Sequence, residues 1–309
     1  MTLQQLEYIL AVARHGHFGR AADACNVTQP TLSAMIGKLE EEIGAKLFDR
    51  NRQPICPTPL GEKVVRQARE VLSQADSIKD IVQEEKQSLE GMFRIGILPT
   101  IAPYLLPRFF PQLMKRYPKL DIRVQEMKTH EIKEALIQGD IDAGILAAIE
   151  GLEEYSQTPI FYEKYVGYVS REDALFKKEV IRTADVAQSS QLWLLDEGHC
   201  FRDQMVRFCQ MKSSQTSQLA YNLGSMETFM RMVESGMGIT FIPELAAMQL
   251  CGSQKELVRP FAIPVPTRQL IMITNRNFIR QTLLEVLVKE IQAGVPKAMW
   301  KLGAGQVLV

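Results

Sequence analysis

One stretch of the sequence, between Pro59 and Gln87, constrains the architecture more than any other. No glycine or proline follows Gly61 in it, and its residues favour a helix throughout. Apolar side chains recur along it at alternating intervals of four and three residues, the heptad spacing of a two-helix coiled coil. This seam consists of Val64, Ala68, Val71, Ala75, Ile78 and Val82. We therefore expect a dimerisation linker helix over residues 59–90, with an amphipathic helix lying on its own domain as the alternative.

Residues 1–58 carry the pattern of a small helix-turn-helix module. Apolar residues at helical spacing from Leu3 to Ala13 precede "FGRAADAC", which predicts a short helix ending near Asn26. Thr28 suits the N-cap of the following helix, and Pro30 suits its first turn. The exposed start of that helix offers side chains that hydrogen-bond base edges and phosphates. We assign DNA contacts to Thr28, Gln29, Pro30, Thr31, Ser33 and Lys38.

The segment "LFDRNRQPICPTPLG" predicts a short β-wing after these helices. Arg50 and Arg52 lie in it, placed to touch phosphates or a minor groove. Charge alone does not single out the module, because basic and acidic residues balance across residues 1–58. On this stretch alone, an ordinary helical hairpin with a polar surface remains the alternative.

The module resembles the LysR-type transcriptional regulators. The resemblance rests on "FGRAADACNVTQPTLSAMIGKLEEEIGAKLFDR" followed by "TPLGE". Positions typical of that family are Ala21, Ala22, Thr28, Gln29, Pro30, Ser33, Leu39, Glu40, Gly44, Leu47, Phe48 and Arg50. It implies an all-α winged helix-turn-helix that binds double-stranded DNA, a coiled-coil linker helix that pairs two chains, and a tetramer built from two such pairs.

From residue 91 onward the pattern changes to alternating strands and helices, which favours parallel βαβ units. "FRIGILPT" predicts a strand that runs into a helix starting at Thr100, and "QLWLLDE" and "RQLIMITNR" predict later strands. The last strand is expected to return to the first subdomain, which gives an α/β domain of two lobes with a ligand cleft between them. Lobe I would hold about 91–162 and 268–309, and lobe II about 163–267. The family resemblance implies the same periplasmic-binding-protein-like form.

Composition excludes several classes of function. The 36 basic and 36 acidic residues balance, so global charge does not indicate a polyanionic partner. No apolar run approaches the roughly 20 residues that span a bilayer, and "MTLQQLEYILAVARHG" lacks the features of a signal peptide. The four histidines show no metal-ligand spacing and no phosphate loop is present, so we expect no metal and no cofactor. Five cysteines, an odd number in a long chain, favour a reducing cytoplasm over a secreted disulfide scaffold.

Two of those cysteines, Cys200 and Cys209, lie nine positions apart in "GHCFRDQMVRFC". Cys200 opens a helical pattern, and a helix N-terminus, Arg202 and a protonated His199 would all lower the pKa of its thiol. On one helix the two cysteines would be about 13 Å apart along the axis and on nearly opposite faces. A disulfide needs Cα atoms within about 7 Å, so bonding this pair would require the segment to refold, as a redox switch does.

Other interpretations of the cysteines stay open at this point. Cys200 and Cys209 could be two core thiols or half of a metal site. Cys25, Cys56 and Cys251 are expected to be structural or incidental, because free cysteine is among the most buried residue types.

The C-terminal half resembles the peroxide-sensing branch of the LysR family, on the motifs "ILPTIAPYLLP", "KTHE" and "EGHCFRDQ…FC". The resemblance implies that Cys200 is the peroxidatic cysteine and that Cys209 resolves it into an intramolecular disulfide. It assigns peroxide binding to Thr100, Thr129, His199 and Arg268. Phe201 departs from the family pattern and would alter access to the thiol.

The function implied by this resemblance is that of a cytoplasmic, homotetrameric activator of antioxidant genes, and not an enzyme. Peroxide would refold residues 198–220, change the pairing of dimers on promoter DNA and alter contact with RNA polymerase. A thiol reductant of the glutaredoxin or thioredoxin type would reset it. The alternatives are a LysR-type regulator whose cleft binds a small organic effector, with inert cysteines, and a thiol peroxidase that turns over peroxide.

Overall fold

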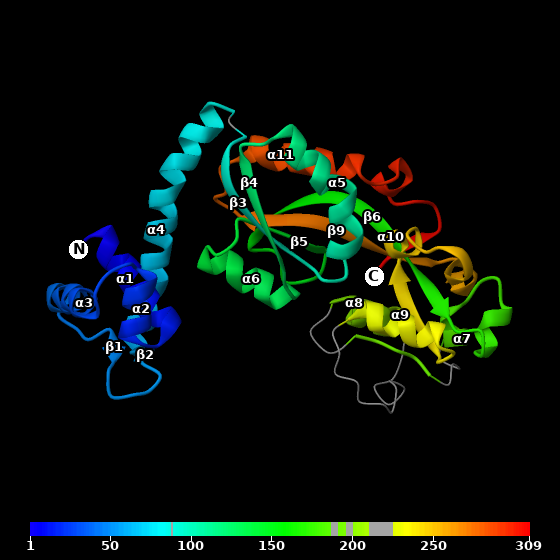
Figure 1. The fold of residues 1–309 in the computed structure, drawn as a ribbon, viewed down its shortest axis with the longest axis horizontal. Helices are drawn as coiled ribbons and strands as arrows, with labels where there is room; N and C mark the ends of the chain where they lie inside the picture. The colour runs from blue at the N-terminus through cyan, green and yellow to red at the C-terminus, as the bar shows by residue number, and fades with distance from the viewer. Residues whose placement is uncertain (88, 187–190, 196–199, 210–224) are drawn as a thin grey trace. The chain divides into compact units, whose positions relative to one another are not determined.

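The computed structural model describes residues 1–87, 89–186, 191–195, 200–209 and 225–309 (Figure 1). The chain divides into two units, Met1–Lys86 and Gln87–Val309. Among the helices of the described ranges, none combines the length and the apolar character that a membrane crossing requires.

The first unit is the expected winged helix-turn-helix. Its elements are α1 (Leu3–His15), α2 (Phe18–Ala24), α3 (Gln29–Ile43), β1 (Phe48–Asp49), β2 (Cys56–Pro57) and α4 (Pro59–Glu85). The turn between α2 and α3 forms as predicted: Asn26 has a left-handed φ of 55°, and the Thr28 side chain caps α3 by accepting a hydrogen bond from the Thr31 N–H. β1 and β2 pair antiparallel and form the wing.

The second unit begins with parallel βαβ units, as the alternating pattern predicts. Strands β3 (Gly91–Ile97), β4 (Leu120–Glu126) and β5 (Ala143–Ala147) pair parallel, with β3 in the centre. Helices α5 (Ala102–Arg116) and α6 (Thr129–Gln138) connect them. The helix after β3 starts at Ala102 and not at Thr100, so the Thr100 side chain lies in the turn before it.

Two long strands then cross between the lobes of this unit (Figure 1). They are β6 (Tyr155–Val169) and β9 (Val265–Asn275), which pair antiparallel. β9 also pairs with β5, which confirms that the late strand returns to the first subdomain. The far end of β6 pairs with β7 (Ile239–Pro243) and β8 (Val258–Pro260). The strand order is β4-β3-β5-β9-β6-β7, and the sheet is therefore mixed.

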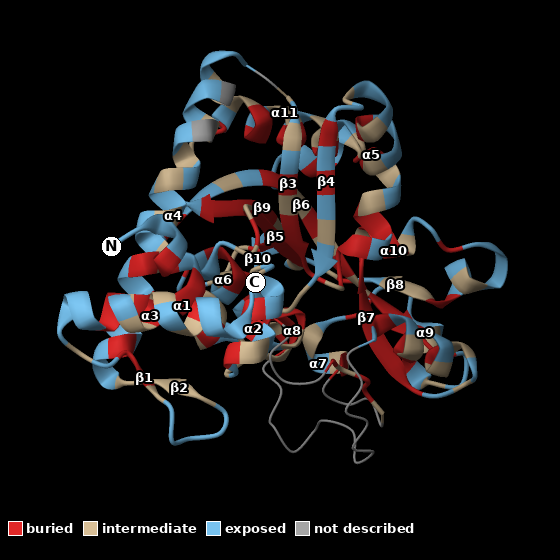
Figure 2. Ribbon diagram, turned by 60° about the vertical axis from the view of Figure 1, so that its left-hand side comes forward, coloured by how far each residue is buried: buried red, intermediate tan, exposed pale blue. Residues whose placement is uncertain are grey.

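Shorter elements complete the second unit: η1 (Ala174–Lys177), α7 (Thr183–Val186), α8 (Cys200–Phe208), α9 (Met226–Glu234), α10 (Glu244–Ala247), η3 (Gly252–Leu257), α11 (Gln281–Ala293), η4 (Lys297–Trp300) and β10 (Gln306–Leu308). β10 pairs parallel with β9. The strand predicted from "QLWLLDE" is absent from its described part, residues 191–195, where only an isolated bridge joins Leu192 to Ile239. Figure 2 shows that β5, β7 and β9 are the most continuously buried strands.

Candidate functional site

A buried ion pair lies where the two crossing strands meet. Glu163 on β6 stands opposite Arg268 on β9 in the antiparallel register, and each side chain is 1% exposed. The Arg268 Nε and one terminal nitrogen both donate to Glu163 Oε2, at 2.9 and 2.7 Å. The other carboxylate oxygen accepts from the Leu245 N–H at 2.9 Å. Both oxygens of the carboxylate are thus held, and the guanidinium is fixed in place.

The same guanidinium binds the turn after β3. Its two terminal nitrogens donate to the Thr100 hydroxyl at 3.2 Å and to the Thr100 carbonyl at 3.1 Å. Burial disfavours the charge of Arg268, but Glu163 more than offsets it, so the pKa of Arg268 lies above its ordinary value. The structure therefore brings two sequence-predicted site residues, Thr100 and Arg268, into direct contact around a permanent positive charge.

Cys200 is the first residue of α8, as the helical pattern predicts, and it is buried as a free thiol. Burial raises the pKa of the Cys200 thiol above its ordinary value, while Arg268 and the nearby Thr129 hydroxyl act in the opposite direction. The expectation of a lowered pKa is wrong for this conformation, because burial outweighs the favourable charges. Arg268 is the main group that favours the thiolate here. His199 lies outside the described residues.

Thr129, the first residue of α6, lies beside this thiol. Its side chain is 7% exposed, and among the described residues its Oγ1 has no partner in hydrogen-bond geometry. It favours the Cys200 thiolate as a hydrogen-bond donor, and its hydroxyl remains available to a small polar ligand. Thr100, Thr129, Cys200 and Arg268 thus gather around one buried point in the second unit.

Tyr165 joins this site to α8. The Arg268 guanidinium carbon lies 5.5 Å from the centre of its ring, and the Phe201 ring meets it edge-on at 5.0 Å. Its hydroxyl donates to Gln204 Oε1 at 2.7 Å. Phe201 is itself 2% exposed, so it packs in the core beside the thiol.

Cys209 ends the same helical run, and its N–H donates to the Met205 carbonyl at 3.0 Å. It is a buried free thiol, and burial raises its pKa to about 12. Nine helical residues separate it from Cys200 by about 13 Å along the axis. In this conformation the two thiols cannot bond, which is the geometry that the spacing predicts for an intact helix.

The remaining cysteines lie elsewhere. Cys25 and Cys56 are half-buried in the first unit, and Cys251 is exposed before η3. None of them contributes a side chain to the contacts of Arg268 described above.

Most of the residues assigned to DNA contact are exposed around the start of α3. Thr28, Gln29, Pro30, Thr31 and Lys38 are exposed, and Ser33 is half-buried. This surface is free of apolar packing within the unit and is compatible with reading a groove.

The two wing arginines differ. Arg52 is 75% exposed and pairs with Asp49. Arg50 lies 4.9 Å over the ring of Phe18 and forms an ion pair with the buried Glu40 carboxylate. Arg50 therefore also holds the wing against the helices, a structural role that the sequence pattern does not reveal.

The predicted seam on α4 divides into two parts. Ala68 is 3% exposed and packs in the core of its own unit, with Val64 partly buried against that core. Val71, Ile78 and Val82 are 37%, 63% and 49% exposed, and Ala75 is half-buried. The first two positions of the seam thus pack within the helix-turn-helix module, which corrects the expectation for Ala68, and the later positions remain open to a partner.

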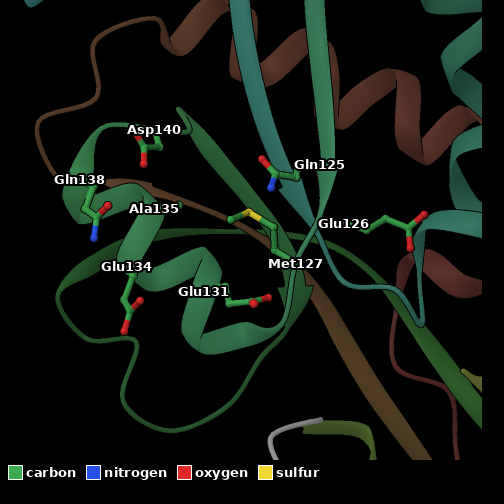
Figure 3. A pocket seen from close by; sticks show the side chains of 8 residues that line it. All are labelled: Gln125, Glu126, Met127, Glu131, Glu134, Ala135, Gln138 and Asp140. Atoms are coloured by element: carbon green, nitrogen blue, oxygen red, sulfur yellow. The ribbon is translucent and has the colours of Figure 1, made fainter. Parts of the chain in front are cut away.

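A shallow pocket lies apart from these residues, at the end of β4 and along α6 (Figure 3). Its lining includes four carboxylates, from Glu126, Glu131, Glu134 and Asp140. None of the sequence-predicted site residues lines it. Across the described ranges, no cluster of three or more histidine, cysteine or acidic side chains is arranged to hold a metal ion.

Three residues of the site were missed by sequence reasoning: Glu163, Tyr165 and Gln204. A signal existed for the first of these, since Glu163 interrupts the apolar strand pattern "PIFYEKYVGYV" with a charge. A buried charge of this kind calls for a partner. The partner, Arg268, lies 105 positions further along the chain, and no local pattern identifies it.

Comparison with known proteins finds a family match for each unit. Residues 3–62 match the bacterial regulatory helix-turn-helix protein model of the lysR family, and residues 86–296 match the LysR substrate binding domain. A hydrogen peroxide-inducible genes activator from Dickeya chrysanthemi is 33% identical over 98% of this chain and 99% of its own length.

Solved structures give the same picture. A full-length OxyR variant from Pseudomonas aeruginosa is 35% identical, with a TM-score of 0.74 over 94% of this chain and 98% of its own. OxyR from Porphyromonas gingivalis is 50% identical, with a TM-score of 0.66 over 71% of this chain and 99% of its own.

Proposed function

The chain belongs to the LysR family of bacterial transcription regulators, and we propose that it is a peroxide sensor whose reactive group is the thiol of Cys200. Family membership makes it a DNA-binding regulator and not an enzyme. Its likeness to hydrogen peroxide-inducible activators over nearly its whole length supports the choice of signal.

One observation carries the proposal: a buried thiol faces a fixed, permanently charged guanidinium. Arg268 lowers the cost of forming the Cys200 thiolate, and Thr129 acts in the same direction. Thr100 is held by Arg268, and the Thr129 hydroxyl has no hydrogen-bond partner in the part of the chain that the structure describes, so both can orient a small hydroxylic ligand. Hydrogen peroxide is a ligand of that size and polarity.

The chemistry follows from these groups. The Cys200 thiolate attacks one peroxide oxygen, the O–O bond breaks, and hydroxide leaves with the electron pair and takes up a proton to become water. Donors aimed at the departing oxygen stabilise its developing charge, and Arg268 is the group placed to do so. The product at Cys200 is a sulfenic acid.

The Cys209 thiolate then attacks the Cys200 sulfur, the S–O bond breaks and a second water is formed. Two thiols and one peroxide thus give one disulfide and two waters. Because the helical run from Cys200 to Cys209 separates the two residues by about 13 Å along its axis, it must unwind before this second step. We place the refolding in residues 198–220; much of that range, including His199, lies outside the described residues.

Refolding of the sensor would alter how chains pair, and thereby the spacing of the α3 helices on promoter DNA. The exposed seam positions of α4 favour a dimer, and two dimers would form the tetramer. The further partners we propose are RNA polymerase, at activated antioxidant genes, and a glutaredoxin- or thioredoxin-type reductant that resets the thiols. A reducing cytoplasm is the compartment in which such a switch functions.

The test is a crosslink map of the full-length reduced protein after near-stoichiometric hydrogen peroxide. Mass spectrometry of unreduced peptides should find Cys200 joined to Cys209, and a Cys200→Ser variant should show no such product. A Cys251→Ser variant serves as the matched control and should crosslink normally.

Other outcomes point elsewhere. Finding Cys200 and Cys209 free, or Cys200 joined to Cys251, would overturn the sensor mechanism and favour a regulator that binds an organic effector. Multiple turnovers of peroxide with a thiol reductant would instead indicate a peroxidase.

A further inference from the structure

We propose that Glu163 is a positioning residue for the reaction of Cys200: it orients the Arg268 guanidinium and partly neutralises its charge, and so restrains the reactivity of the sensor thiol at rest. The inference rests on the proposed function for the meaning of that reactivity. Its physical content is that Glu163 holds Arg268 by hydrogen bonds and that the charge of Arg268 acts on Cys200.

The first step is the rigidity of the pair. Glu163 and Arg268 are cross-strand neighbours on β6 and β9, so the backbone of two long strands sets their separation. Glu163 Oε2 takes two of the guanidinium hydrogen bonds, and Oε1 is held by the Leu245 N–H. On its other side the guanidinium donates to Thr100. Four of the five N–H donors of an arginine are therefore assigned to Glu163 and Thr100.

The second step is the set of charges that face Cys200. Arg268 acts on it from β9 and Asp203 from α8 itself, with opposite signs. Tyr165 acts from β6, and Thr129 from α6 is uncharged. His199 precedes the thiol in sequence and is outside the described part of the chain. Arg268 is the strongest of the influences that favour the thiolate, so the net field at the sulfur depends on how far Arg268 is neutralised.

The third step is the effect of Glu163 on that field. A guanidinium that shares a buried carboxylate presents less than a full positive charge to a third group, because the two opposite charges nearly cancel at a distance. Burial raises the pKa of Cys200, and Arg268 offsets that rise only in part. A resting sensor of this kind keeps its thiol protonated, which limits reaction with weak or accidental oxidants.

Removing the carboxylate charge should therefore release the full charge of Arg268 towards the sulfur. Glu163→Gln keeps the length of the side chain and one oxygen acceptor, and it removes the negative charge. Glu163→Asp keeps the charge but withdraws it by one methylene from the guanidinium. The two variants form a graded series, in which the glutamine variant has the larger effect.

The experiment is the pH profile of iodoacetamide alkylation at Cys200, followed by mass spectrometry of its peptide in the full-length reduced protein. In Glu163→Gln the midpoint should fall by on the order of one pH unit, which is about a tenfold faster alkylation near neutral pH. Glu163→Asp should shift it in the same direction by less. The double variant Glu163→Gln/Arg268→Gln should lose the downward shift, since the charge that causes it is gone.

Glu234→Gln is the matched control, because Glu234 also binds a β6 tyrosine and an arginine, Tyr168 and Arg231, whereas the hydrogen bonds of Arg268 described above go to Glu163 and Thr100. Its midpoint should equal that of the unmodified protein. Circular dichroism decides whether Glu163→Gln is folded; if it is not, the Glu163→Asp midpoint decides. An unchanged midpoint in a folded variant overturns the inference.

The inference and the proposed function fail separately. If peroxide leaves Cys200 unoxidised in the unmodified protein, the sensor proposal falls, while the alkylation midpoints still report the influence of Glu163 on the Cys200 thiol. Normal oxidation together with unchanged midpoints overturns the role of Glu163 alone.

Discussion

The hydroxyl of Tyr165 donates a 2.7 Å hydrogen bond to Oε1 of Gln204, and so ties the crossing strand β6 to the helix that begins at Cys200. Gln204 in turn donates to the Val309 carbonyl at 2.8 Å. Since 200 and 204 are one helical turn apart, these bonds anchor the same face of α8 that carries the reactive thiol. Unwinding of α8 through Gln204 breaks them.

Loosening this anchor should speed disulfide formation. Tyr165→Phe removes one buried hydrogen bond and leaves Gln204 Oε1 unsatisfied, at a cost of about 1–2 kcal/mol to the helical state. The unwound fraction of α8 should rise several-fold, and the Cys200–Cys209 disulfide should appear correspondingly faster after peroxide, measured by quenched-flow mass spectrometry. Tyr168→Phe is the control, since Tyr168 lies on the same strand and makes a comparable hydrogen bond to Glu234 of α9. An equal acceleration in that variant would show that the bond to Gln204 does not restrain α8.

The stability of the reduced form should fall in alkaline solution because of its buried thiols. Burial raises the pKa of Cys209 to about 12, and that of Cys200 is also raised. The folded state thus holds these protons more tightly than the unfolded chain, whose thiols titrate near about 8.5. Their stabilisation is complete below that value and is lost as pH rises from it towards the folded pKa, by up to about 1.4 kcal/mol per pH unit and thiol.

Urea unfolding followed by tryptophan fluorescence measures this loss, because both tryptophans, Trp193 and Trp300, lie in the second unit. Between about pH 8.5 and 10.5 the stability of Cys209→Ala should decline less steeply than that of the unmodified protein. If stability falls equally steeply with pH in both proteins, Cys209 is not the source of the alkaline loss of stability.

Substituting either wing arginine should lower DNA affinity, but for different reasons. Arg52→Ala removes an exposed charge, so binding should weaken equally on all duplexes, with a smaller salt slope and no change in melting temperature. Arg50→Ala also removes the contacts with Phe18 and Glu40, and should in addition lower stability by about 1 kcal/mol. Calorimetry measures the stability of each variant, and salt titration of binding measures the loss of phosphate contacts, so together they distinguish the two effects.

Base reading is expected from the start of α3. Gln29 is exposed there, so Gln29→Ala should reduce the difference in affinity between a cognate site and a random duplex while the salt slope stays the same. Equal discrimination before and after the substitution would argue against base contact at this position.

The divided seam of α4 makes a paired prediction. Ile78→Glu changes a side chain that is 63% exposed in the single chain. It should weaken dimerisation, measured by sedimentation analysis, and leave the melting temperature of the first unit unchanged. Ala68→Glu places a charge in the core of that unit and should unfold it. If Ile78→Glu leaves the dimer unchanged, the dimer interface does not include this part of α4.

Local pattern was sufficient for most elements. Helical spacing, the Thr28 cap and the left-handed Asn26 predicted the helix-turn-helix, and alternating strands and helices predicted the α/β half. The short "QLWLLDE" strand was overestimated, since an apolar run of that length lacks a partner strand to pair with over more than one residue in its described part. Thr100 was placed at a helix start, whereas its hydroxyl is held in the preceding turn by Arg268.

The sequence by itself determined which residues form each helix and most strands, because those choices depend on neighbours within a few turns. Only the tertiary structure decided that Glu163 faces Arg268, that Ala68 is in a core while Ile78 is exposed, and that burial raises the pKa of Cys200. Burial, strand register and the electrostatic field at a residue all depend on residues distant in the chain. They are set only once the strands that carry those residues have paired.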